Sequence, residues 1–275
     1  MPTQAEKARA FHALHQRDRA FVIPNPFDVG SARLLAHLGF EALATTSAGF
    51  AFTRGRPDYG IGREAMLAHV AELVTATELP VSADLENGFG DAPADAAETI
   101  RRGKAAGLCG GSIEDATGRP DDPIYAMDLA VERVRAAAEA AHGGPVPFVL
   151  TARAENFLVG RNDLADTITR LQRYQEAGAD VLYAPGLRTR EDIATVVRAV
   201  DRPVNVLMGM AGVHFTVDEL SALGVKRISV GSALSRAALG GFLAGARELL
   251  EQGTFTFADA ATPYKELERI FRGFP

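Results

Sequence analysis

Two acidic side chains, Asp84 and Glu86, stand two positions apart at the end of an apolar run in SADLENGFGD, residues 82–91. Side chains two residues apart on a β-strand point to the same face, so we expect both carboxylates in one pocket. Glu114 ends the next apolar run and would join them there. Three like charges so close repel, and a divalent cation relieves the repulsion. The alternatives are a solvated strand end or an internal ion pair with Arg153.

Oxygen ligands with no nearby His or Cys favour Mg²⁺ or Mn²⁺ over Zn²⁺. The predicted metal ligands are therefore Asp84, Glu86 and Glu114.

Arg153, in TARAEN, is the cation of this set, and its planar fork suits a substrate carboxylate. An ion pair with Glu114 or Glu155 is an equally good interpretation. The segment Ser47-Ala48-Gly49 adds small residues whose backbone N–H groups could face an anion. Asn205 completes the predicted substrate-binding residues.

These residues must be positioned by a repeating pattern of short apolar runs and longer amphipathic segments. The runs are nearly continuously apolar, as in parallel strands that are covered on both faces. Eight strands with helices between them predict a (β/α)₈ barrel, with a doubly wound open sheet as the alternative. The predicted strands are 21–25, 41–47, 80–86, 109–115, 147–155, 180–186, 203–209 and 227–234.

A barrel of this kind carries its active site at the carboxyl ends of the strands. Acids, hydroxyls and the arginine end four neighbouring predicted strands, in segments 45–49, 84–87, 114–115 and 153–156. The chain is expected to form one domain, 1–275, with 235–275 as a C-terminal helical extension. Its apolar tail would pack on the barrel or on a neighbouring subunit.

Composition excludes several classes of protein. The formal net charge of −6 gives no basic footprint for nucleic acid, and no apolar stretch is long enough to cross a membrane. The single Cys109, expected in the core, fits a reducing compartment, so we expect a cytoplasmic protein. His12 and His15 are expected on the surface. Schiff-base chemistry is disfavoured because no lysine ends a predicted strand; the lysines are Lys7, Lys104, Lys226 and Lys265.

The sequence resembles the isocitrate lyase/phosphoenolpyruvate mutase superfamily. The matching stretches run in order over roughly residues 20–160: NPFDVGSARLLAHLGFEALATTSAG, GRPDYG, PVSADLENGFG, SIED and TARAENF. The resemblance implies a Mg²⁺-dependent barrel enzyme acting on 2-oxo acids, with helices exchanged between subunits of a homodimer or homotetramer.

By matching position, the resemblance also assigns roles to residues. Ser47, Ala48 and Gly49 would hold the substrate carboxylate. Asp84 would be the central metal ligand, and Arg153 would contact the oxo acid. Water molecules on the metal would be held by Asp58, Glu86 and Glu114.

The chain departs from the superfamily at the loop ATGRPDDPIYAMD, residues 116–128. This loop lacks the Lys-x-Cys-Gly-His motif of the isocitrate and methylisocitrate lyases, whose Cys is the acid/base. The proton donor would then be water or Tyr59. We expect a lyase for small 2-oxo or 2-hydroxy di- or tricarboxylic acids, acting by C–C cleavage or decarboxylation. The alternatives are a 2-oxo acid binding protein with little catalysis, or a phosphonopyruvate (P–C bond) enzyme.

Overall fold

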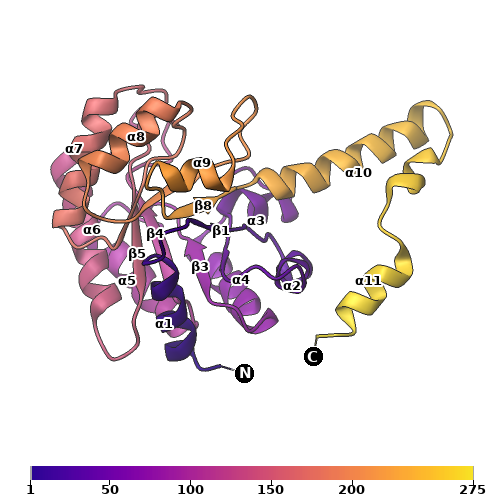
Figure 1. Cartoon of the computed structure of the whole chain (residues 1–275), viewed down its shortest axis with the longest axis horizontal. Coiled ribbons are helices and arrows are strands. Elements are labelled where there is room, and N and C mark those ends of the chain that lie inside the picture. Colours follow the sequence, from indigo (N-terminus) through magenta and orange to yellow (C-terminus); the bar gives the residue numbers. More distant parts are fainter. Residues whose placement is uncertain (1, 275) are drawn as a thin grey trace.

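Eight parallel strands form one curved sheet in the computed structural model, which describes residues 2–274 (Figure 1). The hydrogen-bonded order is β1-β8-β7-β6-β5-β4-β3-β2. Between the two outermost strands, the N–H of Ala44 donates to the carbonyl of Pro24 at 3.1 Å, so the barrel is nearly closed. The strands are β1 (Phe21–Ile23), β2 (Leu43–Ala44), β3 (Val81–Asp84), β4 (Gly110–Glu114), β5 (Val149–Arg153), β6 (Val181–Tyr183), β7 (Val204–Leu207) and β8 (Arg227–Ser229).

The (β/α)₈ prediction is therefore confirmed, and each strand is shorter than its apolar run. The helices are α1 (Gln4–Leu14), α2 (Val29–His37), α3 (Ser47–Thr53), α4 (Arg63–Ala76), α5 (Pro93–Ala105), α6 (Met127–His142), α7 (Leu164–Glu176), α8 (Arg190–Ala199), α9 (Val217–Ala222), α10 (Ala233–Glu251) and α11 (Tyr264–Phe271), with a 3₁₀ turn at Thr256–Ala260. Helix α3 was not expected from the sequence, which placed residues 45–49 at the end of a predicted strand. Thr46 caps this helix, because its side chain accepts from the N–H of Gly49.

Glycine ends several helices just before the next strand. Gly39, Gly107, Gly178 and Gly224 all have φ between 88° and 105°, the left-handed region that side chains disfavour. Each reverses the chain at the amino end of the barrel, which explains why an Ala-Gly or Leu-Gly pair recurs along the sequence.

Helix α1 packs at the amino end of the barrel. Phe11 is buried there against Phe21 and Cys109, which confirms Cys109 as a core residue. The expectation of a surface His15 is wrong: its ring is buried edge-on between Phe11 and Phe21, and its Nδ1 pairs with the Phe11 carbonyl at 2.9 Å. Burial lowers the pKa of His15 to about 3, so this imidazole is neutral.

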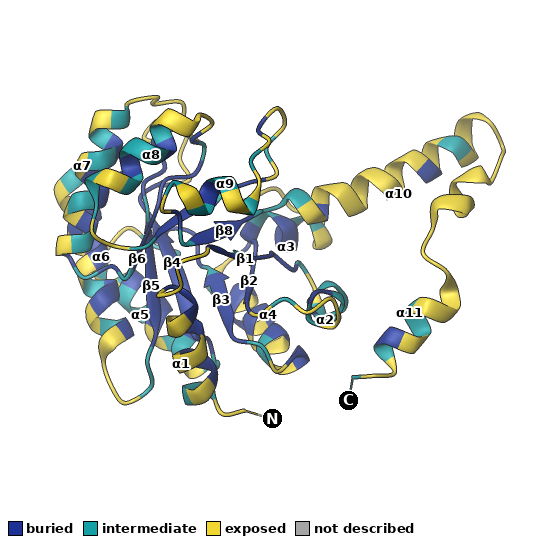
Figure 2. Ribbon diagram, viewed as in Figure 1, coloured by how far each residue is buried: buried dark blue, intermediate teal, exposed yellow. Residues whose placement is uncertain are grey.

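After β8 the chain leaves the barrel. Helix α10 extends outward with nearly all of its residues exposed, and α11 returns to pack on α2 (Figures 1 and 2). None of the helices between residues 2 and 274 combines the length and apolarity of a membrane span.

Candidate active site

A cavity of about 370 Å³ opens inside the barrel at the carboxyl ends of the strands. Eight of the ten predicted site residues line it, and Gly49 and Glu86 do not. Its polar lining includes Asn25, Thr45, Thr46, Ser47, Asp58, Tyr59, Ser82, Asp84, Ser112, Glu114, Arg153, Glu155, Tyr183, Asn205, Arg227, Ser229 and Ser232. The strand ends therefore meet as the barrel prediction required.

Arg153, the last residue of β5, lies at the centre of this lining. Its guanidinium contacts three carboxylates: Asp84 at 2.7 Å, Glu114 at 3.0 Å and Glu155 at 2.7 Å. Burial alone would lower the pKa of Arg153, but the charges of Glu114, Glu155 and Asp84 outweigh it and raise the pKa well above its ordinary value. The internal ion pairs of Arg153 that the sequence left open are thus present, with Asp84, Glu114 and Glu155 as partners.

Strand register explains why these groups meet. Glu114 pairs with Arg153 across β4 and β5, and Arg153 pairs with Tyr183 across β5 and β6. The Tyr183 ring lies under the guanidinium, with its centroid 5.3 Å from the central carbon. A cation over an aromatic face is attracted by the ring, and this contact helps to fix the plane of the fork.

Asp84 is shared between Arg153 and the amino end of α3. Its Oδ1 faces Arg153, while its Oδ2 accepts from the Ser47 hydroxyl at 2.9 Å and from the Ser47 N–H at 3.2 Å. Ser47 Oγ also lies 3.1 Å from Oδ1 of Asp58. Burial first, and then the charge of Asp84, raise the pKa of Asp58. Two carboxylates therefore compete for one hydroxyl proton.

The segment Ser47-Ala48-Gly49 is less available to an anion than the sequence suggested. The Ser47 N–H is bound to Asp84, and the Gly49 N–H donates to Thr46 at 3.2 Å. A Cβ on Gly49 would lie 3.1 Å from Phe27, so this glycine serves packing of α3 against the barrel.

Glu86 does not share the cavity with Asp84, contrary to the prediction from their two-residue spacing. Strand β3 ends at Asp84, and Glu86 has a φ of 49°, so strand alternation does not extend to it. Its side chain is buried outside the cavity lining. Burial, followed by the charges of Asp84 and Asp58, raises the pKa of Glu86 to about 8.

Tyr59 and Glu114 form a second polar unit at the mouth. The Tyr59 hydroxyl donates to Glu114, and Tyr59 holds a φ of 59° in the loop between α3 and α4. Burial, then the charge of Glu114, raise the pKa of Tyr59 well above its ordinary range. Burial also raises the pKa of Glu114, with Glu155 and Asp84 adding to the effect and Arg153 opposing it. Both shifts favour the protonated forms of the two side chains.

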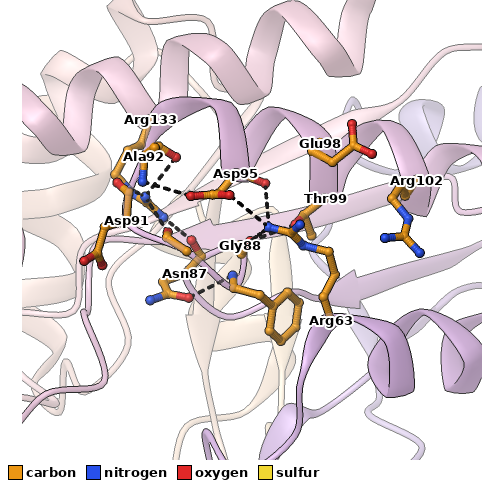
Figure 3. Close-up of polar contacts among 12 residues, drawn as sticks. Arg63, Asn87, Gly88, Asp91, Ala92, Asp95, Glu98, Thr99, Arg102 and Arg133 are labelled. Carbon is orange, nitrogen blue, oxygen red and sulfur yellow. Dashed lines mark hydrogen bonds and ion pairs between the residues drawn. The ribbon is translucent and has the colours of Figure 1, made fainter.

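A buried arginine holds the loop that follows Asp84 (Figure 3). Arg133 of α6 donates to the carbonyls of Asn87, Gly90, Asp91 and Ala92. Left-handed φ values at Glu86, Gly88 and Phe89 turn the chain sharply here, and strained turns of this kind persist only where their surroundings hold them.

Arg63 of α4 holds the same loop from the other side. It donates to the Gly88 carbonyl at 3.0 Å and pairs with Asp95 at 3.4 Å (Figure 3). The loop is thus fixed to the two helices α4 and α6.

The acids suit a hydrated Mg²⁺ better than a metal held entirely by side chains. Within residues 2–274, no three His, Cys, Asp or Glu side chains are placed to chelate an ion together. Mg²⁺, however, keeps several of its waters and needs only one or two carboxylates. The raised pKa values of Glu86 and Asp58 reflect, after burial, negative charge that the protein leaves uncompensated beside Asp84. A cation there would compensate it.

Sequence reasoning underrated three residues. Glu155, considered from the sequence only as an alternative partner of Arg153, also lines the cavity. Tyr183 and Arg227 were not considered; the only signal for Arg227 was a charge at the start of an apolar run. Asn205 lies in the cavity as predicted, bound to Ser229 at 3.0 Å and to Arg227 at 2.9 Å.

The loop at 116–128 folds back as a short hairpin beside the mouth. The N–H of Thr117 donates to the carbonyl of Pro123 at 3.0 Å, and Ala116 pairs with Ile124. Arg119 and Tyr125 both bind Asp91, at 2.8 Å and 2.6 Å. The hairpin is thereby fastened to the loop after Asp84.

Acids, an arginine and a hydroxyl around a cavity at the strand carboxyl ends define a barrel of the enzyme class. Residues 11–250 match the sequence profile of the phosphoenolpyruvate phosphomutase family. The 2-methylisocitrate lyase of Escherichia coli K12 is 30% identical over 244 residues, covering 84% of this chain and 81% of that enzyme.

Two solved structures share the fold over nearly the whole chain. A Burkholderia cenocepacia J2315 protein with a provisional lyase/mutase assignment is 63% identical, with a TM-score of 0.96, covering 98% of this chain and 97% of that one. Oxaloacetate acetylhydrolase in complex with its product oxalate is 26% identical, with a TM-score of 0.86 and coverage of 98% and 95%. This chain belongs to the phosphoenolpyruvate phosphomutase family, within the isocitrate lyase/PEP mutase superfamily, and is an enzyme of its carbon–carbon lyase type.

Replacing Arg133 with Met should destabilise the protein by about 3 kcal/mol, because buried carbonyls lose their donor. Urea unfolding measures the effect. Arg135→Met, on the exposed face of the same helix, is the matched control and should cost less than about 0.5 kcal/mol. Equal costs for the two variants would contradict the role assigned to Arg133.

Proposed function

We propose that this enzyme is a Mg²⁺- or Mn²⁺-dependent lyase for a small 2-oxo or 2-hydroxy di- or tricarboxylic acid. It would break the bond beside the carbonyl, by C–C cleavage or decarboxylation, through an enolate. The observation that carries the proposal is the placement of Arg153 among three carboxylates in a polar cavity. Two relatives named for 2-methylisocitrate and oxaloacetate support this substrate class.

In this proposal, the chain's own residues bind and orient the oxo acid. Arg153 turns its fork toward the substrate and exchanges one carboxylate partner for the negative charge of the enolate oxygen. Ser47 and Asp58 hold Asp84 in position from the α3 side. Ala48, at the amino end of α3, presents its backbone to the substrate carboxylate.

The metal would be held by Asp84, with Asp58, Glu86 and Glu114 holding its waters. When bound, it supplies Lewis-acid stabilisation of the charge that develops on the carbonyl oxygen.

Tyr59 is the proposed proton donor to the enolate carbon. Its hydroxyl stays protonated in this site, and Glu114 behind it has a raised pKa, so the pair can deliver and recover a proton. This arrangement would replace the cysteine that the loop at 116–128 lacks.

Schiff-base catalysis has no support in the cavity. None of the four lysines lines it, and three of them donate to backbone carbonyls elsewhere: Lys7 to Thr77, Lys104 to Ala141 and Gly143, and Lys226 to Arg17.

Asp84→Ala should reduce kcat/KM by at least about 10²-fold, because it removes the group that joins Arg153, Ser47 and the metal. The assay uses Mg²⁺ with oxaloacetate, methylisocitrate, dimethylmalate and phosphonopyruvate. Asp121→Ala, in the exposed part of the 116–128 loop, is the control and should leave turnover unchanged. No turnover of any substrate above the rate with metal alone would refute the lyase proposal. Turnover of phosphonopyruvate alone would favour a P–C bond enzyme.

Tyr59→Phe should lower kcat by about 10²-fold with little change in KM, since the ring that packs against Gly118 is kept and only the proton is lost. Steady-state kinetics on the substrate found above measure both constants. Tyr264→Phe, on an exposed ring of α11, is the control. An unchanged kcat would assign the proton to water.

We also propose that α10 packs on a second copy of the chain. The helix leaves the barrel with Phe242 and Leu250 70% and 87% exposed, a surface that isolated monomers rarely present. The double substitution Phe242→Glu and Leu250→Glu should convert an oligomer into a monomer, as measured by light scattering. Leu38→Glu, also at an exposed apolar side chain, should not. A monomeric unsubstituted chain would refute the proposal.

A further inference from the structure

Arg227 lies deep inside the barrel and is not used by the mechanism above. It is the first residue of β8, 5% exposed, and it lines the cavity. Its Nε donates to the Asn205 Oδ1 at 2.9 Å and its Nη2 to the Thr151 Oγ1 at 3.0 Å. The guanidinium therefore reaches across the barrel interior from β8 to β5.

The surroundings of Arg227 differ from those of Arg153 in one respect. Arg153 has three carboxylate partners, whereas Asn205 and Thr151, the partners of Arg227, are neutral. The buried Nη1 of Arg227 has no hydrogen-bond partner within the described chain. Burial, and then the positive charge of Arg153, lower the pKa of Arg227 to about 10. A buried cation without a counter-ion is costly, so an anion bound beside Arg227 would offset that cost.

Other elements provide no negative charge to fill this need. From α1, His15 is close enough for the charge of Arg227 to lower its pKa, but His15 is neutral and its own Nε2 also lacks a partner. From β6, Tyr183 is a protonated phenol whose pKa burial raises to about 12. Within residues 2–274, Arg227 therefore has no carboxylate partner, and an anion beside it would come from outside the protein.

The cavity extends down to Arg227 because the barrel interior is filled by small polar side chains. Ser82, Ser112 and Ser229 line the cavity, in a barrel interior that usually carries bulky apolar residues. Thr151 precedes Arg153 by two residues on β5, so Arg227 reaches this strand nearer its amino end than the position of Arg153. A short diacid could contact both arginines.

We propose that Arg227 binds a carboxylate in this lower part of the cavity, and that this carboxylate is the second acid group of the substrate. The anion site at Arg227 does not depend on the proposed lyase function. Only the identification of the anion as a substrate carboxylate rests on that function. It makes Arg227 the residue that selects diacids over mono-acids, while Arg153 and the Asp84 side of the cavity bind the 2-oxo acid end.

The first experiment tests the anion site alone, without metal or turnover. Thermal unfolding of the unsubstituted protein and of Arg227→Met is followed with increasing sodium formate, in EDTA, with ionic strength held by sodium HEPES. Formate should raise the melting temperature of the unsubstituted protein and not that of Arg227→Met, since a ligand stabilises only the state that binds it. Equal responses, or none in either protein, would overturn the proposal and leave a water between Arg227 and His15.

Arg227→Lys is the matched variant, because it keeps the charge and loses the fork. It should retain a weaker formate response. Arg227→Met removes an uncompensated buried charge and should melt no lower than the unsubstituted protein in the absence of formate. If Arg227→Met does not fold, Arg227→Gln replaces it in the same comparison.

The second experiment identifies the source of the carboxylate. With Mg²⁺ present, calorimetry compares the unreactive diacid succinate with the mono-acid butyrate. The unsubstituted protein should prefer succinate by about ten- to a hundred-fold, the value of a hydrogen bond to a charged group, and Arg227→Met should lose the preference. A preference that survives in Arg227→Met, together with a lost formate response, would assign the site to a free anion. Failure of the turnover assay would refute the lyase but leave the formate result valid.

Discussion

Arg153 and the three carboxylates around it are the interaction on which this site depends. Asp84, Glu114 and Glu155 come from three different strand ends, and each would be costly to bury without a cation. The arginine brings them within one cavity and leaves a net negative charge there. That remaining charge is the feature on which the proposed metal and substrate binding rest.

The scaffold around Arg153 is itself polar and buried. Asp115 accepts from the Glu155 N–H at 2.8 Å, from the Tyr174 hydroxyl at 2.5 Å and from Arg170 at 3.0 Å. Removing one member of such a network strands the others without partners. On the opposite side, Arg133 fixes the loop after Asp84 in the same manner. The backbone at Glu155 and the loop after Asp84 are therefore each held by hydrogen bonds that do not involve Arg153.

Charge is distributed along the barrel axis in a way that fits the proposed chemistry. Acids and the hydroxyl of Tyr59 lie at the mouth, and an arginine with neutral partners lies below. The superfamily's lyases, which the sequence resembles, place a cysteine on a loop over the mouth. Here that loop is a hairpin bound to Asp91, and Tyr59, hydrogen-bonded to Glu114, is the proposed proton donor.

The sequence by itself determined the barrel, because eight short apolar runs alternate with helical segments, several of them ended by glycine, under local rules of strand and helix formation. It also determined which strand ends carry the acids and Arg153, since barrel strands all end on one face. The tertiary structure alone decided the partners. It paired Asp84 with Arg153 and Ser47. It also gave Glu86 a left-handed φ, in a bent loop where strand alternation no longer applies. It also revealed Arg227 as a buried cation, because whether a charge finds a counter-ion depends on side chains far apart in sequence.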